Sequence, residues 1–252
     1  MTALAGIMRI ELSRQTRRRR LLFFALLAAA PVVVAAVWVS ARGVASAHEL
    51  LGALFVITYL HFLIPFTALF FGSGLISEEV GAQTLTYLLV RPVSRLGILA
   101  GKFLAFLVMM LLFVMVSLGL AVLVLWLGGG GSIESVGLVA GCVLTAAVAV
   151  VAYGSFFTML GVLVAHPVVP GLALLIIWEG MVSNISGLMS RFTLVFYLRS
   201  LFMDVTDVTV SALGSLSPCG IVRAVVTPLA MAAVTMLVAW WRLSRRQFTP
   251  PA

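Results

Sequence analysis

The sequence has few charged residues: Asp, Glu, Lys and Arg make up 10% of its 252 residues, whereas 63% are hydrophobic. A soluble domain carries charges on roughly a quarter of its residues. This chain cannot supply such a surface, so the soluble classes of protein are excluded. A polar segment long enough to form a separate soluble domain is also missing. We therefore expect one integral membrane domain over residues 1–252.

Acidic residues are scarcer still, with 8 Asp and Glu against 16 Lys and Arg, and the formal net charge is +8. A basic excess is common in nucleic-acid-binding proteins, but the positions of the basic residues indicate otherwise. Four arginines at 17–20 directly precede an apolar run, and Arg242, Arg245 and Arg246 directly follow another. Such residues meet anionic lipid headgroups and keep a segment in the cytoplasm. We expect a lipid bilayer, and no nucleic acid, as their partner.

Cysteine is nearly absent, and the two cysteines, Cys142 and Cys219, each lie near the start of an apolar run. A cysteine in such a place behaves as a small hydrophobic residue. A disulfide between the two near the outer face is the alternative. Neither belongs to a metal-site spacing, so no metal site is expected.

A complete nucleotide-binding motif is missing as well. Gly101-Lys102 looks like the end of a phosphate-binding loop. That motif needs glycine five residues before the pair, where Leu96 stands, and Ser or Thr after it, where Phe103 stands. The chain is therefore not expected to bind ATP by itself.

Catalytic motifs are equally incomplete. His48-Glu49 begins like a zinc-protease motif, but the second histidine would fall at Gly52. The sequence has no serine-hydrolase elbow. We expect no catalytic residues and no cofactor in this chain.

What the sequence does contain is six long apolar runs. In lipid every backbone N–H and C=O must be satisfied within the chain, and about 20 residues of helix cross the apolar layer. The period-two alternation of a membrane barrel is absent. We predict an all-α polytopic membrane protein with six transmembrane helices, at approximately 21–41, 50–76, 103–127, 136–165, 168–189 and 219–241.

The basic residues predict the orientation of these helices. With the N-terminus inside, most of the arginines and Lys102 are cytoplasmic, and only Arg42, Arg191 and Arg199 lie in outer loops. Both termini and the segment 77–102 are then cytoplasmic. Residues 4–16 show apolar residues at helical spacing with charges beside them. This pattern predicts an amphipathic helix on the inner surface, and a frayed charged tail is the alternative.

The third outer loop, residues 190–218, is too apolar for a free loop and too charged for a span. We predict one or two short helices that lie in the outer interface or dip into it. An extracytoplasmic protein partner would bind at this loop.

One acidic residue, one arginine and one histidine fall inside the predicted spans. Glu179 lies near the middle of the fifth, where an ionised carboxylate is costly, so it is either functional or a hydrogen-bonded residue that holds helices together. Arg223, near the outer end of the sixth, is a candidate partner of Glu179, or else extends outward to Asp204 or Asp207. His61 in the second span is either a packed, hydrogen-bonded residue or a ligand.

The longest polar interruption in the first half of the chain is the segment 77–102, between the second and third spans. It resembles the loop that follows the second span in permease subunits of the second class of ABC exporters. That loop has a Glu, a Gly-Thr-Leu turn, a Leu pair, a basic-Pro-Val-Ser-Arg stretch and a Gly-Lys. The matching residues are Glu79, Thr84, Leu85, Leu88, Leu89, Arg91, Pro92, Val93, Ser94, Arg95, Gly101 and Lys102. Gln83 stands where the family has glycine.

The resemblance implies that the loop forms a short cytoplasmic coupling helix, which docks on a separate ABC ATPase subunit. It further implies two ATPase copies, a second permease copy as a homodimer, and a bacterial cytoplasmic membrane. ATP and magnesium would bind to the ATPase. An ordinary cytoplasmic loop whose charges only set the topology is the alternative.

The residue types of the loop suit such docking. Charged residues make strong, oriented contacts and apolar residues anchor an interface, while proline ends the helix before it. We expect charged contacts from Glu78, Glu79, Arg91 and Arg95, apolar anchors at Leu85, Tyr87 and Leu88, and the helix end before Pro92.

Two functions stay open at this point. The chain is either the permease of an ABC transporter that moves a substrate, or a mechanical transducer that passes an ATP-driven change to an extracytoplasmic protein without moving a solute. The compact single domain resembles the branch that contains the nitrous-oxide-reductase maturation and gliding-motility permeases. The sequence does not identify a substrate.

Overall fold

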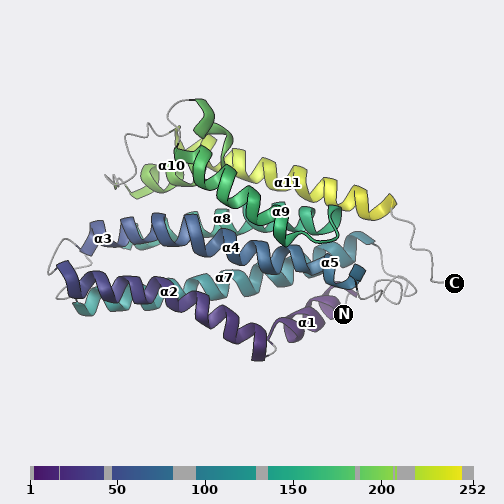
Figure 1. The fold of residues 1–252 in the computed structure, drawn as a ribbon, viewed down its shortest axis with the longest axis horizontal. Coiled ribbons are helices and arrows are strands. Elements are labelled where there is room, and N and C mark those ends of the chain that lie inside the picture. Colours follow the sequence, from purple (N-terminus) through teal and green to yellow (C-terminus); the bar gives the residue numbers. More distant parts are fainter. Residues whose placement is uncertain are drawn as a thin grey trace.

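The long helices lie side by side along the long axis of the molecule (Figure 1). The computed structural model describes residues 3–16, 18–42, 47–81, 95–128, 136–184, 188–206, 208 and 219–245. Every regular element in these ranges is a helix, and five of them are long and apolar enough to cross a membrane. The prediction of an all-α polytopic membrane protein is confirmed.

The five spanning helices follow the predicted apolar runs. They are α2 (Arg18–Arg42), the second span, α7 (Arg95–Gly128), α8 (Val136–Leu163) and α11 (Ile221–Arg245). The second span is one unbroken helix made of α3 (Ala47–Leu54), η1 (Phe55–Leu63), α4 (Ile64–Thr67), η2 (Ala68–Gly72) and α5 (Ser73–Gly81). The third span begins at Arg95 rather than at 103, because buried Ile98 and Leu99 continue its apolar face.

Segments η1 and η2 are π-helices, whose hydrogen bonds join residues five apart. Pro65 lies between them at the start of α4 and has no N–H to donate to a regular α-helical ladder. A third π-helix, η3 (Leu174–Met181), directly follows α9 (Val168–Ala173). His61 falls in η1 and Glu179 in η3, so two of the predicted intramembrane polar residues lie in π-helical turns, which are frequent at functional sites.

The fifth apolar run differs from the prediction. Its helix has six residues in α9 and eight in η3, and it ends at Met181 rather than at 189. At about 1.5 Å per residue it is about 21 Å long, shorter than an apolar layer of roughly 30 Å. Short 3₁₀ turns follow at Val182–Asn184 and Leu188–Phe192. The Glu179 side chain then binds amide groups further along the chain, at the start of α10.

Helix α10 (Leu194–Thr206) is the predicted short helix between the fifth and sixth spans, but it is buried in the bundle. Its apolar residues recur at helical spacing, and they pack against α8, α11 and η1. The ring of Phe202 lies 5.1 Å from the ring of Phe55 in η1. Helix α10 therefore dips into the structure rather than covering its outer surface.

Helix α8 is central and contacts α5, α7, α10 and α11. Small residues let these neighbours approach its backbone closely, as in other membrane bundles. A Cβ atom on Gly161 would lie 2.1 Å from the carbonyl oxygen of Ser73, and one on Gly154 would lie 2.6 Å from Cε1 of Phe106. The contact of α8 with α5 thus needs glycine at 161.

Replacing Gly161 by alanine should destabilise the bundle, because the new methyl group would collide with the backbone of Ser73 rather than with a movable side chain. We expect a loss of about 1–3 kcal/mol, as for other overpacked sites, measured by unfolding the purified protein in mixed detergent and SDS. Gly137→Ala is the control on the same helix, since a Cβ there meets nothing within 4 Å. Equal stability of the two variants would contradict this packing.

Candidate functional site

The predicted ATPase-coupling residues lie at, and between, the ends of α5 and α7. Glu78 and Glu79 fall on the last turn of α5, and Arg95 is the first residue of α7. The other predicted coupling residues lie outside the described residues: Thr84, Leu85, Tyr87, Leu88, Arg91 and Pro92. The coupling helix therefore stays a prediction, and the structure shows the two helices that lead into and out of its segment.

A buried lysine joins these two helices to the N-terminal helix α1 (Ala3–Gln15). Lys102, on α7, donates to the carbonyl oxygen of Leu75 on α5 at 3.2 Å and pairs with the carboxylate of Glu11 on α1 at 3.3 Å. Both charged side chains are at most 5% exposed. The predicted N-terminal helix is thus present and packs against α7, where its one buried acid neutralises the lysine.

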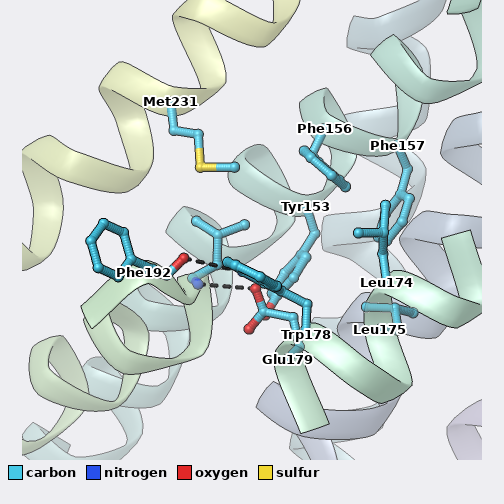
Figure 2. A pocket seen from close by; sticks show the side chains of 10 residues that line it. Tyr153, Phe156, Phe157, Leu174, Leu175, Trp178, Glu179, Phe192 and Met231 are labelled. Carbon is cyan, nitrogen blue, oxygen red and sulfur yellow. Dashed lines mark hydrogen bonds between the residues drawn. The ribbon is translucent and has the colours of Figure 1, made fainter. Parts of the chain in front are cut away.

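Glu179 lies against the start of α10 (Figure 2). Its Oε1 accepts the backbone N–H of Leu194 at 3.0 Å, and its Oε2 accepts the N–H of Val195 at 3.0 Å and the hydroxyl of Tyr153 at 3.2 Å. The first N–H groups of a helix have no partner within that helix, and they favour a negative charge. Glu179 therefore caps α10 from a different helix, which is the helix-holding role considered for it.

Arg199 lies one helical turn beyond Val195 on α10, is 2% exposed, and interacts electrostatically with Glu179 and Tyr153. Its guanidinium contacts Nε2 of His61, and Nδ1 of His61 lies 2.7 Å from the carbonyl oxygen of Val56. Arginine only donates, so Nε2 accepts and Nδ1 carries the proton. His61 is thus a neutral, packed residue that orients Arg199.

The positive partner of Glu179 is Arg199 rather than the predicted Arg223. Arg223 is exposed near the start of α11, and the hydrogen bonds of Glu179 come from α8 and α10. The burial of Arg199 could have been read from its neighbours on the same helix face, because the residues three and four positions away are all apolar: Val195, Phe196, Phe202 and Met203. No pattern in the sequence indicated that Glu11 pairs with Lys102.

A comparison with protein families identifies the chain. The sequence profile of the family described as "ABC-2 family transporter protein" matches residues 8–183. The chain belongs to the ABC-2 transporter family. No curated protein matches it. The family and the spanning helices make this chain a multi-pass membrane protein and the permease component of an ABC transporter, whose partner is an ABC ATPase.

The ABC-2 match covers both helices that flank the coupling segment and extends as far as Glu179, whereas Leu194, Val195 and Arg199 lie beyond it. The ABC-2 region of the permease therefore includes the carboxylate of the buried cluster and the donor Tyr153, and the chain that follows supplies the other two donors.

Removing one member of the Glu11–Lys102 pair should destabilise the permease, because it leaves a buried charge without its partner. We expect Glu11→Ala to cost roughly 3 kcal/mol of unfolding free energy in detergent. The double variant Glu11→Leu with Lys102→Met removes both charges and should recover most of this loss. If the double variant loses as much stability as the single variants Glu11→Leu and Lys102→Met lose together, the pair is not coupled.

Glu179→Ala should cost about 3 kcal/mol of stability, because three donors lose their acceptor and Arg199 loses the negative charge near it. Glu179→Gln keeps one acceptor oxygen and should fall between the parent and the alanine variant. The measurement is unfolding in detergent, with Glu49→Ala on exposed Glu49 of α3 as the control. If the alanine variant matched its Glu49 control, the capping role would be excluded.

Proposed function

We propose that this permease couples ATP hydrolysis on a separate ATPase subunit to the movement of a substrate across the bacterial cytoplasmic membrane. The observation that carries the proposal is the ABC-2 match, which includes the whole segment between α5 and α7. ATP and magnesium belong to the ATPase, because this sequence lacks a complete phosphate-binding loop. The active assembly has two ATPase copies and two copies of this chain.

The ends of the described helices support a common cytoplasmic side. Helix α1, the end of α5 and the end of α11 lie toward the same end of the bundle (Figure 1). Basic residues gather at this end, with Arg9 and Arg14 on α1 and Arg242 and Arg245 on α11. By the positive-inside rule, this end faces the cytoplasm and both termini are cytoplasmic.

A mechanical route leads from the coupling segment into the bundle. The carbonyl oxygen of Leu75 on α5 accepts a hydrogen bond from Lys102. From α5 the second span continues without a break through α4 to His61, which contacts Arg199. A push on the segment from the ATPase would therefore move the second span and reach the cluster at Glu179. The π-helical turns η1 and η2 in this span are where the helix can adjust.

Substrate movement is favoured over mechanical transduction to an outer protein. The transducer hypothesis needs a surface on residues 190–218, but α10 is buried over most of its length. Of the described residues in this range, Arg191 and Phe192 are the exposed ones at its start. An extracytoplasmic partner stays a prediction that this burial does not favour.

The coupling role is tested by the double variant Glu79→Ala with Arg95→Ala. Two lost charge-assisted contacts should weaken ATPase binding at least about tenfold, with a matching fall in permease-stimulated ATP hydrolysis. The readouts are co-purification of the ATPase and its hydrolysis rate in proteoliposomes. Glu49→Ala with Arg191→Ala, at exposed positions remote from the segment, is the matched control. Unchanged binding and hydrolysis in the Glu79 and Arg95 variant would refute docking through these residues.

A further inference from the structure

A cavity of about 290 Å³ opens beside Glu179, between α8, η3 and α11 (Figure 2). Its wall is aromatic and aliphatic, and Glu179 and Tyr153 supply the polar groups. The lining side chains are Tyr153, Phe156, Phe157, Leu174, Leu175, Trp178, Glu179, Phe192, Leu194 and Met231. Pockets that bind small molecules have this composition: a mostly apolar wall with a few placed polar groups.

The cavity lies at membrane depth and is open on the side of the bundle. Tyr153 and Met231 are near the middle of two spanning helices, α8 and α11. Trp178 and Phe192 are 45% and 71% exposed, and the Trp178 indole N–H donates to the carbonyl oxygen of Phe192 at 3.3 Å. These rings form the rim, which faces the hydrocarbon of the bilayer. A ligand that enters from this side must dissolve in lipid.

The carboxylate of Glu179 has room for one more donor. Its two oxygens offer about four acceptor positions. Among the described residues three donors reach them, with Oε2 receiving two and Oε1 receiving one. A ligand in the cavity can therefore donate one hydrogen bond to Oε1.

The charges near Glu179 indicate whether a ligand that donates to it is charged or neutral. Arg199 already interacts electrostatically with this carboxylate, so a second cation would have an uncompensated charge in an apolar cavity. A neutral hydroxyl group avoids this cost. The volume lies at the low end of ligand pockets, which hold about 300–1,000 Å³, so one chain or a small ring fits but a whole two-chain lipid does not.

From these contacts we infer that the cavity is a binding site for a neutral, lipid-soluble alcohol, with its hydroxyl group on Glu179 and its apolar body between Phe156, Trp178 and Met231. The site lies within one copy of the chain. It does not depend on the proposed coupling to the ATPase.

The test uses the purified permease in detergent, in a variant whose only tryptophan is Trp178. The other tryptophans are replaced by phenylalanine: Trp38, Trp126, Trp240 and Trp241. Bromoundecanol and bromoundecane, which differ by one hydroxyl group, are then compared as quenchers of Trp178. We expect saturable quenching by the alcohol, with an apparent affinity about tenfold higher than that of the alkane, the ratio that one charge-assisted hydrogen bond supports.

Two variants separate the cavity from the general lipid surface. Leu174→Phe fills the cavity and should abolish the saturable component, whereas Ile176→Phe on the exposed face of η3 should keep it. If Leu174→Phe does not fold, reversal of the quenching by unlabelled dodecanol in the parent protein replaces it.

Three results would overturn the inference. Equal, non-saturating quenching by the alcohol and the alkane would mean simple partitioning into the detergent. No reversal by dodecanol would exclude a specific site. Stronger competition by dodecylamine than by dodecanol would contradict the neutral head group. Because the ATPase is absent from this experiment, none of these results bears on the coupling proposal.

Discussion

The arrangement of the second half of the chain depends on the bonds between Glu179 and the first amide groups of α10. These N–H groups cannot be satisfied within their own helix, and Leu194 and Val195 are buried. The carboxylate accepts two of them and so holds α10 against η3 and α8. Once this contact forms, the fifth helix must end close to Glu179, and the chain must turn back.

The same contact explains why a charge can lie so deep. Arg199 lies on the helix that Glu179 caps. Folding therefore brings the positive charge of Arg199 close to Glu179 together with the amide groups. His61 from the second span and Tyr153 from α8 complete the hydrogen bonds. Four segments that are distant in sequence thus meet at one cluster, and its members are fixed relative to one another. The cavity beside Trp178 uses the part of the carboxylate that this cluster leaves accessible.

A buried ion pair does comparable work near the C-terminal end of the second span. Lys102 and Glu11 tie α1, α5 and α7 together beside the segment predicted to meet the ATPase. The second span joins the two clusters as one unbroken helix with π-helical turns in it. This connection gives the proposed coupling a physical path, because polar groups hold the helix at Leu75 and at His61.

The apolar runs could be predicted from sequence because a bilayer makes each helix satisfy its own backbone. The first four runs became long helices, of which only the third begins well before its predicted start, and the loop between the second and third spans indicated the family later found. The run after Val168 was predicted too long. Its composition continues past Met181, but its end is set by a side-chain contact with residues that follow it in sequence.

The sequence by itself therefore determined the fold class and the ABC-2 identity, since these follow from local composition and a local motif. Only the tertiary structure decided which charges pair. The sequence suggested Arg223 as the partner of Glu179 and placed Arg199 in an outer loop, yet Arg223 is exposed and Arg199 lies buried on the helix that Glu179 caps. A buried charge is stabilised by the donors and opposite charges that folding brings close to it. The distance along the chain between these residues does not reveal which of them will meet.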